Sequence, residues 1–246
     1  MERLDQALLT RGLAESRSKA KAAIEAGAVT VNGKPVVKPA FSVEDSDEVS
    51  VATEKVCPYV SRGGLKLEYA LDAFKISPMG KTAIDVGAST GGFTDCLLQR
   101  GALRVFAVDS GRMQLSEKLL YDPRVIAMEK YNARYLKSED FFISPELAVM
   151  DVSFISQTLI HEALSNILQA GADFITLVKP QFECGRASLN KKGIVKDEKE
   201  RLVAIEKVSK SAEGFGFSHI ATVKSPILGG DGNIEYLAHF KKTRDT

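Results

Sequence analysis

The stretch TAIDVGASTGGFTDCLL, residues 82–98, combines an apolar strand, a glycine-rich turn and an amphipathic helix, in that order. The strand ends at Val86, and Gly87 permits a sharp turn of the backbone after it. Gly91 and Gly92 have no Cβ and therefore allow a ligand to approach the amino terminus of the helix. The stretch predicts the entrance of a nucleotide site, for a ligand that contains adenosine.

The spacing of this turn argues against two common nucleotide-binding motifs. It lacks the second and third glycines of G-x-G-x-x-G and the Gly-Lys-Ser/Thr ending of a P-loop. Asp85 before the first glycine and Phe93 after the last instead resemble the first motif of S-adenosylmethionine-dependent methyltransferases. A second apolar strand ends in Asp109, whose carboxylate can accept hydrogen bonds from both ribose hydroxyls. The alternative is a generic glycine turn of an α/β protein.

Strand and helix patterns alternate along the rest of the chain. The predicted elements are strand 82–87, helix 92–100, strand 103–108, helix 114–121, strands 125–129 and 147–152, helix 156–169, strand 173–178, helix 197–213, and strands 218–224 and 234–240. Alternation of this kind predicts an α/β fold with a mostly parallel sheet covered by helices on both faces. The last two strands are expected to form an antiparallel edge. The pair Gly63-Gly64 marks a predicted boundary before the helix that opens this domain.

Four charged residues stand where such a sheet binds its ligands, beyond the carboxyl ends of the strands. Asp151 and Lys179 each follow an apolar strand, Glu235 lies in the edge hairpin, and Lys66 lies in the opening helix. We expect these two lysines and two carboxylates to converge beside the glycine turn. For any one of them taken alone, an ordinary ion-pair network is the alternative.

The amino-terminal region differs in charge from the rest. Residues 1–38 carry seven Lys and Arg against four Asp and Glu, whereas residues 39–54 carry five acids and no base. Ser16 or Ser18 is the predicted cap of a helix that Gly27 ends. A short strand, a type I′ turn at Asn32-Gly33 and a returning strand follow. A helix and hairpin with basic residues at one end can bind a phosphate backbone.

The segment RLDQALLTRGLAESRSKAKAAIEAGAVTVNGKPV resembles the small RNA-binding domain of ribosomal protein S4 and of many pseudouridine synthases. The resemblance covers about the first 55 residues. It implies RNA contact through the basic side chains of Arg11, Arg17, Lys19, Lys21 and Lys34. The alternative is that these side chains only solvate an exposed helix face.

The whole chain resembles the TlyA family, also called hemolysin-A-like proteins, through the strings GASTGGFTD, DPRVIAMEKYNAR, MDVSFIS, LVKPQFE, KGIVKD and GNIEY. That family joins an S4-type RNA-binding domain to an FtsJ-like methyltransferase domain. The resemblance implies 2′-O-methylation of a cytidine ribose in ribosomal RNA, with S-adenosylmethionine as cofactor and with ribosomal RNA or a ribosomal subunit as partner. It predicts an RNA-binding domain over residues 1–55, a linker over 56–63 and a methyltransferase domain over 64–246.

The resemblance also implies the roles of individual residues. Lys66, Asp151, Lys179 and Glu235 match the catalytic Lys-Asp-Lys-Glu tetrad of FtsJ-like 2′-O-methyltransferases. The implied cofactor-binding residues are Asp85, Gly87, Ala88, Ser89, Gly91, Gly92, Phe93, Asp109, Glu129 and Asn132. Asn132 has a second reading as the cap of the helix that follows it. The chain departs from some relatives at CPYV, residues 57–60, where Tyr59 replaces a tryptophan of a linker that couples RNA binding to cofactor binding.

The reaction requires alignment of the ribose oxygen with an already activated methyl group, and removal of one proton. Lys179 is the predicted base. An ordinary lysine pKa of about 10.4 keeps the side chain protonated, so burial or the neighbouring Lys66 must lower that pKa. Asp151 and Glu235 are expected to orient the nitrogen of Lys179. In the alternative, Lys179 only positions the hydroxyl.

Composition restricts the remaining classes. The 246 residues carry a net charge of +1, with no apolar run of membrane-spanning length and no signal-like amino terminus, so we expect a cytoplasmic protein without membrane contact. Cys57, Cys96 and Cys184 lie far apart, which argues against a disulfide framework. The three histidines are not spaced as metal ligands, and no metal is expected.

The sequence leaves two other functions to consider, a membrane-active protein and a non-catalytic RNA-binding factor. A membrane-active hemolysin fits the residues poorly, because no spanning segment or strongly amphipathic basic helix is evident. A non-catalytic RNA-binding or ribosome-assembly factor is disfavoured by the intact tetrad. Family members with short termini are expected to modify large-subunit RNA only, and the present chain is assigned to them; its oligomeric state is left open.

Overall fold

The computed structural model describes residues 1–14, 16–52, 57–229 and 232–243, which form two compact units, Met1–Pro58 and Tyr59–Thr246. Each unit is described by itself. Residues 53–56, which contain the predicted boundary between the first domain and the linker, lie outside the described residues.

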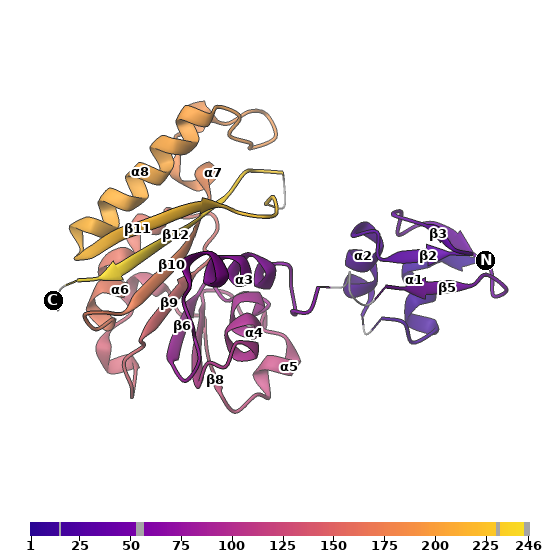
Figure 1. The fold of residues 1–246 in the computed structure, drawn as a ribbon, viewed down its shortest axis with the longest axis horizontal. Coiled ribbons are helices and arrows are strands. Elements are labelled where there is room, and N and C mark those ends of the chain that lie inside the picture. Colours follow the sequence, from indigo (N-terminus) through magenta and orange to yellow (C-terminus); the bar gives the residue numbers. More distant parts are fainter. Residues whose placement is uncertain (15, 53–56, 230–231, 244–246) are drawn as a thin grey trace. The chain divides into compact units, whose positions relative to one another are not determined.

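The first unit is a small α+β domain (Figure 1). Its elements are β1 (Glu2–Arg3), α1 (Leu4–Thr10), α2 (Arg17–Glu25), β2 (Val29–Val31), β3 (Lys34–Pro35), β4 (Ser42–Val43) and β5 (Val49–Val51). Strands β3, β2 and β5 form an antiparallel sheet, and β1 pairs with β4. Leu4, Leu8 and Ile24 of the two helices pack with the buried valines of the strands.

Local signals of the first unit act as the sequence predicts. The Ser16 hydroxyl caps α2 by accepting the Lys19 N–H at 3.3 Å. Asn32 and Gly33 have φ angles of 50° and 74°, the left-handed conformation of a type I′ turn, between β2 and β3.

The second unit is built on a seven-stranded sheet with the order β11-β12-β10-β9-β6-β7-β8. The strands are β6 (Thr82–Val86), β7 (Arg104–Asp109), β8 (Val125–Glu129), β9 (Leu147–Met150), β10 (Asp173–Val178), β11 (Phe217–Lys224) and β12 (Tyr236–Lys242). Strands β6 to β10 pair in parallel, whereas β12 is antiparallel to both β10 and β11. The predicted parallel sheet with an antiparallel edge is confirmed.

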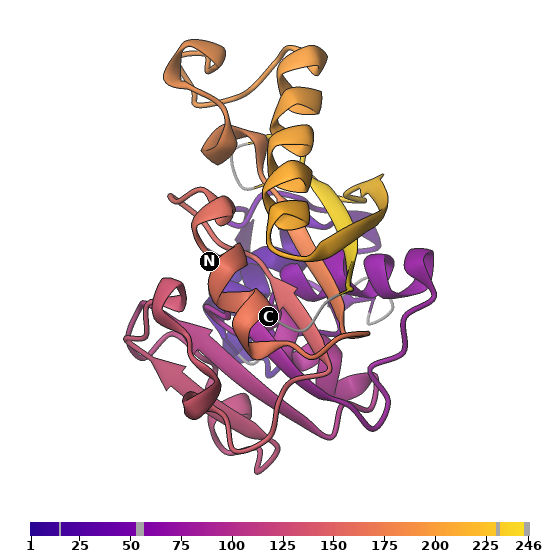
Figure 2. The same ribbon diagram turned by 90° about the vertical axis from the view of Figure 1, so that its left-hand side faces the viewer.

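Helices cover both faces of this sheet (Figures 1 and 2). The helices are α3 (Gly63–Phe74), α4 (Gly92–Gln99), α5 (Glu117–Leu120), α6 (His161–Ile167), α7 (Pro180–Glu183) and α8 (Glu198–Gly214). Short 3₁₀ turns lie at Ala133–Tyr135, Ser138–Asp140, Gln157–Leu159 and Arg186–Ser188. Residues of α6 and α8 pack with Ile84, Phe106 and Phe174 in one large apolar cluster.

Two expectations about the helices were wrong. The predicted helix 114–121 is only the single turn α5, because the loop before it is held by carboxylates: Gly111 N–H donates to Asp109, and Met113 N–H donates to Glu129. The pair Gly63-Gly64 lies inside the first turn of α3 rather than before it. A Cβ on Gly64 would stand 2.3 Å from the Tyr59 ring, so this glycine serves close packing.

Candidate active site

The glycine turn after β6 forms the floor of the site. Gly87 has a φ of +84°, and a Cβ there would stand 2.5 Å from the carbonyl oxygen of Asp151. The N–H groups of Gly87 and Ala88 donate to the Val108 carbonyl at 2.8 and 3.1 Å, which fixes the turn to β7. Helix α4 begins directly after Gly91, which has no side chain to cap it. The turn therefore presents backbone rather than side chains to a ligand.

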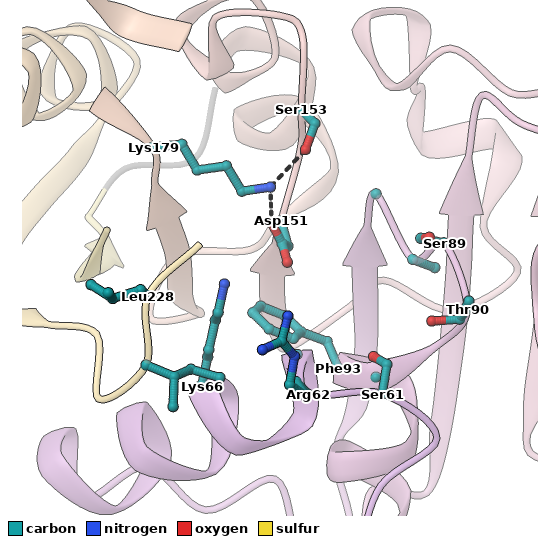
Figure 3. Close-up of a pocket in the computed structure, with 15 residues that line it drawn as sticks. Ser61, Arg62, Lys66, Ser89, Thr90, Phe93, Asp151, Ser153, Lys179 and Leu228 are labelled. Carbon is teal, nitrogen blue, oxygen red and sulfur yellow. Dashed lines mark hydrogen bonds and ion pairs between the residues drawn. The ribbon is translucent and has the colours of Figure 1, made fainter. Parts of the chain in front are cut away.

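A pocket of about 340 Å³ opens above this turn (Figure 3). Its walls come from the start of α3, the glycine turn, the ends of β9 and β10, and the loop between β11 and β12. The lining residues are Ser61, Arg62, Gly63, Lys66, Gly87, Ala88, Ser89, Thr90, Gly92, Phe93, Asp151, Ser153, Lys179, Ile227 and Leu228. Three of the four predicted catalytic residues thus line the same pocket as the predicted cofactor loop.

The four predicted catalytic residues form two ion pairs. Lys66 Nζ lies 2.5 Å from Glu235 Oε2, and Lys179 Nζ lies 2.6 Å from Asp151 Oδ1. Lys179 also donates to the Ser153 hydroxyl at 2.7 Å. All four side chains are largely buried, from 3% exposed for Glu235 to 22% for Asp151. The expectation that Glu235 would orient Lys179 was wrong, because Lys66 on α3 takes that carboxylate.

Asp85 lies beneath the glycine turn and does not line the pocket. Its side chain is fully buried and accepts a hydrogen bond from the Thr94 hydroxyl of α4 at 2.7 Å. Burial raises the pKa of Asp85 to about 7, against the lowering effect of the Thr94 hydrogen bond. Asp85 therefore links β6 to α4 from below.

Asp109 and Glu129 end the neighbouring strands β7 and β8, in register with each other. The Asp109 carboxylate accepts the Ser89 N–H at 2.8 Å and the Gly111 N–H at 2.6 Å. Glu129 accepts the N–H groups of Met113 and Gln114, and these hydrogen bonds lower its pKa. Both carboxylates thus shape the loops beside the glycine turn.

Asn132, one of the predicted cofactor ligands, caps a 3₁₀ turn. Its side-chain oxygen accepts the Arg134 N–H at 3.1 Å at the start of the 3₁₀ turn Ala133–Tyr135. The second reading of this residue in the sequence is therefore the one that the structure records.

The predicted RNA-contacting residues fall into two groups. Arg11 donates to the carbonyls of Asp47 and Glu44 at 2.6 and 2.7 Å, and Arg17 pairs with the buried Asp5 at 3.2 Å. Lys21 forms an exposed pair with Glu25. Lys19 and Lys34 are exposed. Both arginines therefore stabilise the first unit as well as adding to its positive surface.

Two residues at or near the pocket were not assigned a role from the sequence: Ser153, which lines the pocket, and its neighbour Phe154. Ser153 and Phe154 lie two and three residues after Asp151. Phe154 is 92% exposed, has a φ of +63° and packs on Phe182 at a ring separation of 5.2 Å. A large aromatic side chain in this backbone conformation is unusual and favours a functional role. The available signals were their position, two and three residues after a strand-end carboxylate, and their place in the string MDVSFIS.

The segment before α3, with which the second unit begins, is held against α3 and α4. The Tyr59 hydroxyl donates to Glu68 at 2.9 Å, and the Val60 N–H donates to Asp95 of α4 at 2.9 Å. Tyr59 is buried against Gly64. Tyr59 thus holds the segment against α3, the helix that borders the pocket.

Two of the histidines contact polar side chains of the second unit. His161 is buried beside Ser211, and His239 contacts Asp173 at 3.0 Å. Within the described ranges, no three His, Cys, Asp or Glu side chains gather as metal ligands. None of the helices in those ranges combines the length and apolarity needed to cross a membrane.

Comparisons with known proteins agree with this geometry. Residues 59–242 match the FtsJ-like methyltransferase family, and residues 2–49 match the S4 domain. The chain is 42% identical over 243 residues to the 16S/23S rRNA (cytidine-2′-O)-methyltransferase TlyA of Mycobacterium tuberculosis, covering 99% of this chain and 91% of that protein. It is 36% identical over 245 residues to the 23S rRNA (cytidine-2′-O)-methyltransferase TlyA of Campylobacter jejuni, covering 92% and 94%.

Among solved structures, a provisionally assigned hemolysin from Streptococcus thermophilus matches with a TM-score of 0.79 and 47% identity, over 99% of this chain and 89% of that one. The family match spans most of the chain and includes the glycine turn and both ion pairs. The chain therefore belongs to the FtsJ-like family of S-adenosylmethionine-dependent methyltransferases and carries an S4 domain.

Proposed function

We propose that this enzyme methylates the 2′-hydroxyl of a cytidine in ribosomal RNA, and that its target lies in the large subunit. The observation that carries the proposal is the convergence of Lys66–Glu235 and Lys179–Asp151 on the pocket above the glycine turn. The names of both TlyA relatives include the 23S RNA, whereas only one includes the 16S RNA. A ribosomal target also supports a cytoplasmic location.

The residues around the pocket fit S-adenosylmethionine. The uncapped amino terminus of α4 offers backbone N–H groups and a positive dipole end to the carboxylate of the amino-acid moiety. Each oxygen of Asp109 accepts one N–H group and retains lone pairs for the ribose hydroxyls. The predicted ligands of the glycine turn, Ala88 and Ser89, line the pocket. When bound, the cofactor supplies a methyl group activated by the sulfonium charge.

The lysine–carboxylate pairs position the substrate hydroxyl. Lys179 Nζ donates to the Ser153 hydroxyl and forms an ion pair with Asp151. An ammonium group has three N–H donors, so a donor remains for the ribose oxygen. In its neutral form the nitrogen accepts the hydroxyl proton, and in its charged form it only holds the oxygen lone pairs in place. Lys66 extends into the same pocket from α3 (Figure 3). Its Nζ forms an ion pair with Glu235.

The S4 domain is the proposed anchor on the RNA. We assign the phosphate contacts to Arg11, Arg17, Lys19, Lys21 and Lys34, and the organisation to an RNA-binding domain 1–55, a linker 56–63 and a catalytic domain 64–246. The support is the match of residues 2–49 and the exposure of Lys19 and Lys34 on the first unit. Such contacts bind the RNA backbone without reading its sequence.

Transfer of a radiolabelled methyl group from S-adenosylmethionine to separated ribosomal subunits that lack the modification tests the proposal. Wild type is expected to label the large subunit at the ribose of one cytidine, identified by mass spectrometry. Lys179→Ala is expected to lower the rate by about 10²- to 10⁴-fold, the range of a lost acid–base group, while RNA affinity is retained.

The control is Lys210→Gln, which replaces an exposed lysine that is distant in sequence from the pocket residues. This variant should methylate the large subunit at the wild-type rate. Cofactor binding without transfer to either subunit would contradict the proposed substrate. Equal labelling by wild type and Lys179→Ala would contradict the proposed role of the tetrad. A non-catalytic assembly factor would bind the cofactor and the RNA normally but would transfer no methyl group to either subunit.

A further inference from the structure

A basic segment projects from the second unit between α7 and α8 (Figure 2). We call residues 185–196 the basic arm. It contains four cations, Arg186, Lys191, Lys192 and Lys196, and no acidic residue. All four side chains are exposed. Across the described ranges, none of the four forms an ion pair, which leaves their charges available to a partner.

The basic arm has a defined internal structure. Leu189 and Val195 form an antiparallel bridge, and Gly193 turns the chain with a φ of +72°. The Asn190 side chain accepts the N–H groups of Lys192 and Ile194 at 2.8 and 3.0 Å. Lys191 and Lys192 therefore lie in a turn whose backbone is fixed by hydrogen bonds.

The arm is fastened to the segment that carries Glu235. Asn233, only 1% exposed, accepts the Val195 N–H and donates to the Gly193 carbonyl, both at 3.1 Å. Arg201 donates to the Val195 carbonyl at 3.1 Å and to the Tyr236 hydroxyl at 3.3 Å. Residues on both sides of Glu235 therefore hold the returning limb of the arm.

This arrangement joins a positive surface to one of the ion pairs of the pocket. The loop between β11 and β12, which contains Asn233 and Glu235, also supplies Ile227 and Leu228 to the pocket wall. On the other side of the arm, α7 follows Lys179 directly. A strand of RNA whose target ribose enters the pocket has to pass its flanking phosphates over the surrounding surface. Exposed lysines without protein partners suit phosphate groups, because they attract the backbone regardless of sequence.

We infer that the basic arm is a second RNA-binding surface, which grips the phosphates that flank the target nucleotide, and that Asn233 is a positioning residue that holds this surface in register with the pocket. The inference rests on the proposed function. It assigns the RNA grip to both units, with the S4 domain as one contact and the arm as another.

Salt dependence of binding tests the arm. The full-length double variant Lys191→Gln/Lys192→Gln is compared with a control, Lys75→Gln/Lys210→Gln, that removes the same charge from positions not assigned to the arm. Affinity for large subunits lacking the modification is measured between about 50 and 200 mM salt, where phosphate contacts dominate the dependence. Each lost lysine contact is expected to reduce the slope of log K against log salt by about 1.

The arm variant should therefore lose about 2 from the slope, whereas the control should keep the wild-type slope. Equal slopes for both variants would overturn the inference. Methyl transfer by wild type is measured in parallel and tests the proposed function separately. Normal methylation by wild type together with equal slopes would support the proposed function and reject the RNA-binding role of the arm. A wild type that binds no RNA would reject both the proposed function and the role of the arm.

A double-mutant cycle tests the positioning role of Asn233. Asn233→Ala alone is expected to raise KM for the subunit with unchanged affinity for S-adenosylmethionine, measured by calorimetry. When Lys191→Gln/Lys192→Gln is already present, Asn233→Ala should raise KM little further, because the effects of residues that act through the same contact are not additive. Full additivity, or a loss of cofactor affinity, would show that Asn233 only stabilises the fold. Arg201→Gln provides the same test should Asn233→Ala not fold.

Discussion

Lys66 Nζ and Glu235 Oε2 lie 2.5 Å apart, although 169 residues separate them in the sequence. The lysine comes from the first helix of the second unit and the carboxylate from the hairpin that closes its sheet. Because both side chains are buried, removing either charge leaves the other without a partner in a low-dielectric environment. The pair therefore connects the fold of the sheet to the chemistry of the pocket.

Glu235→Gln is expected to reduce kcat by about 10²-fold, because a neutral amide no longer fixes Lys66 in the pocket and small displacements of positioning groups have effects of this size. Affinity for S-adenosylmethionine should change little. Single-turnover methyl transfer and calorimetry measure the two quantities, with Glu213→Gln at the end of α8 as control. An unchanged kcat would remove Glu235 from the proposed tetrad.

Phe154→Ala is expected to weaken productive binding of RNA without affecting the cofactor. Phe154 is 92% exposed beside Ser153 and Phe182, where it offers an aromatic face to a base. Stacking of one base on an aromatic side chain contributes about 1–3 kcal/mol, so kcat/KM for the subunit should fall by about tenfold or more. Phe154→Tyr retains the ring and should restore activity. Equal loss in both variants would argue against stacking.

Asp85→Asn is expected to change how stability depends on pH. The pKa of Asp85 is raised from 3.8 to about 7 in the fold, chiefly by burial. The folded state therefore binds more protons than the unfolded state between these values, and the free energy of unfolding falls as the pH rises through that window. The fall should amount to a few kcal/mol, since one pKa unit corresponds to about 1.4 kcal/mol.

Urea unfolding of wild type and Asp85→Asn at several pH values measures this difference. The variant has no group that titrates at this position, so its stability should vary less between pH 4 and 7. Parallel pH profiles of the two proteins would contradict the assignment of the raised pKa to Asp85.

Arg11 and Lys34 are expected to respond differently to loss of charge. Arg11→Gln should lower the free energy of unfolding of the first unit by about 1 kcal/mol, because its guanidinium holds the carbonyls of Glu44 and Asp47. Lys34→Gln should leave stability unchanged and reduce the salt slope of RNA binding by about 1. Thermal unfolding and salt-dependent binding of both variants separate the two effects. A destabilised Lys34→Gln would contradict this division.

The strands were predictable from sequence because each is a buried apolar run between turn residues, as in Thr82–Val86 before Gly87. The pairing of the tetrad was not, since the helix that carries Lys66 and the hairpin that carries Glu235 meet only in the folded sheet. The Gly63-Gly64 pair was predicted as a boundary for a related reason. Gly64 is required by its close contact with Tyr59, and no local sequence pattern indicates that contact. Interactions of loops with strand-end carboxylates, such as Met113 with Glu129, likewise shortened a helix that its own sequence favours.

Strand β12 lies between β10 and β11 in the sheet, although both are synthesised before it. While the chain emerges from the ribosome, β10 and β11 have no common partner, and the acid that fixes Lys66 has not yet been made. A nascent chain can complete the glycine turn and the Lys179–Asp151 pair but not the second ion pair. The ion pair of Lys66 is therefore expected to be among the last contacts of the second unit to form during synthesis, after the elements that build the glycine turn.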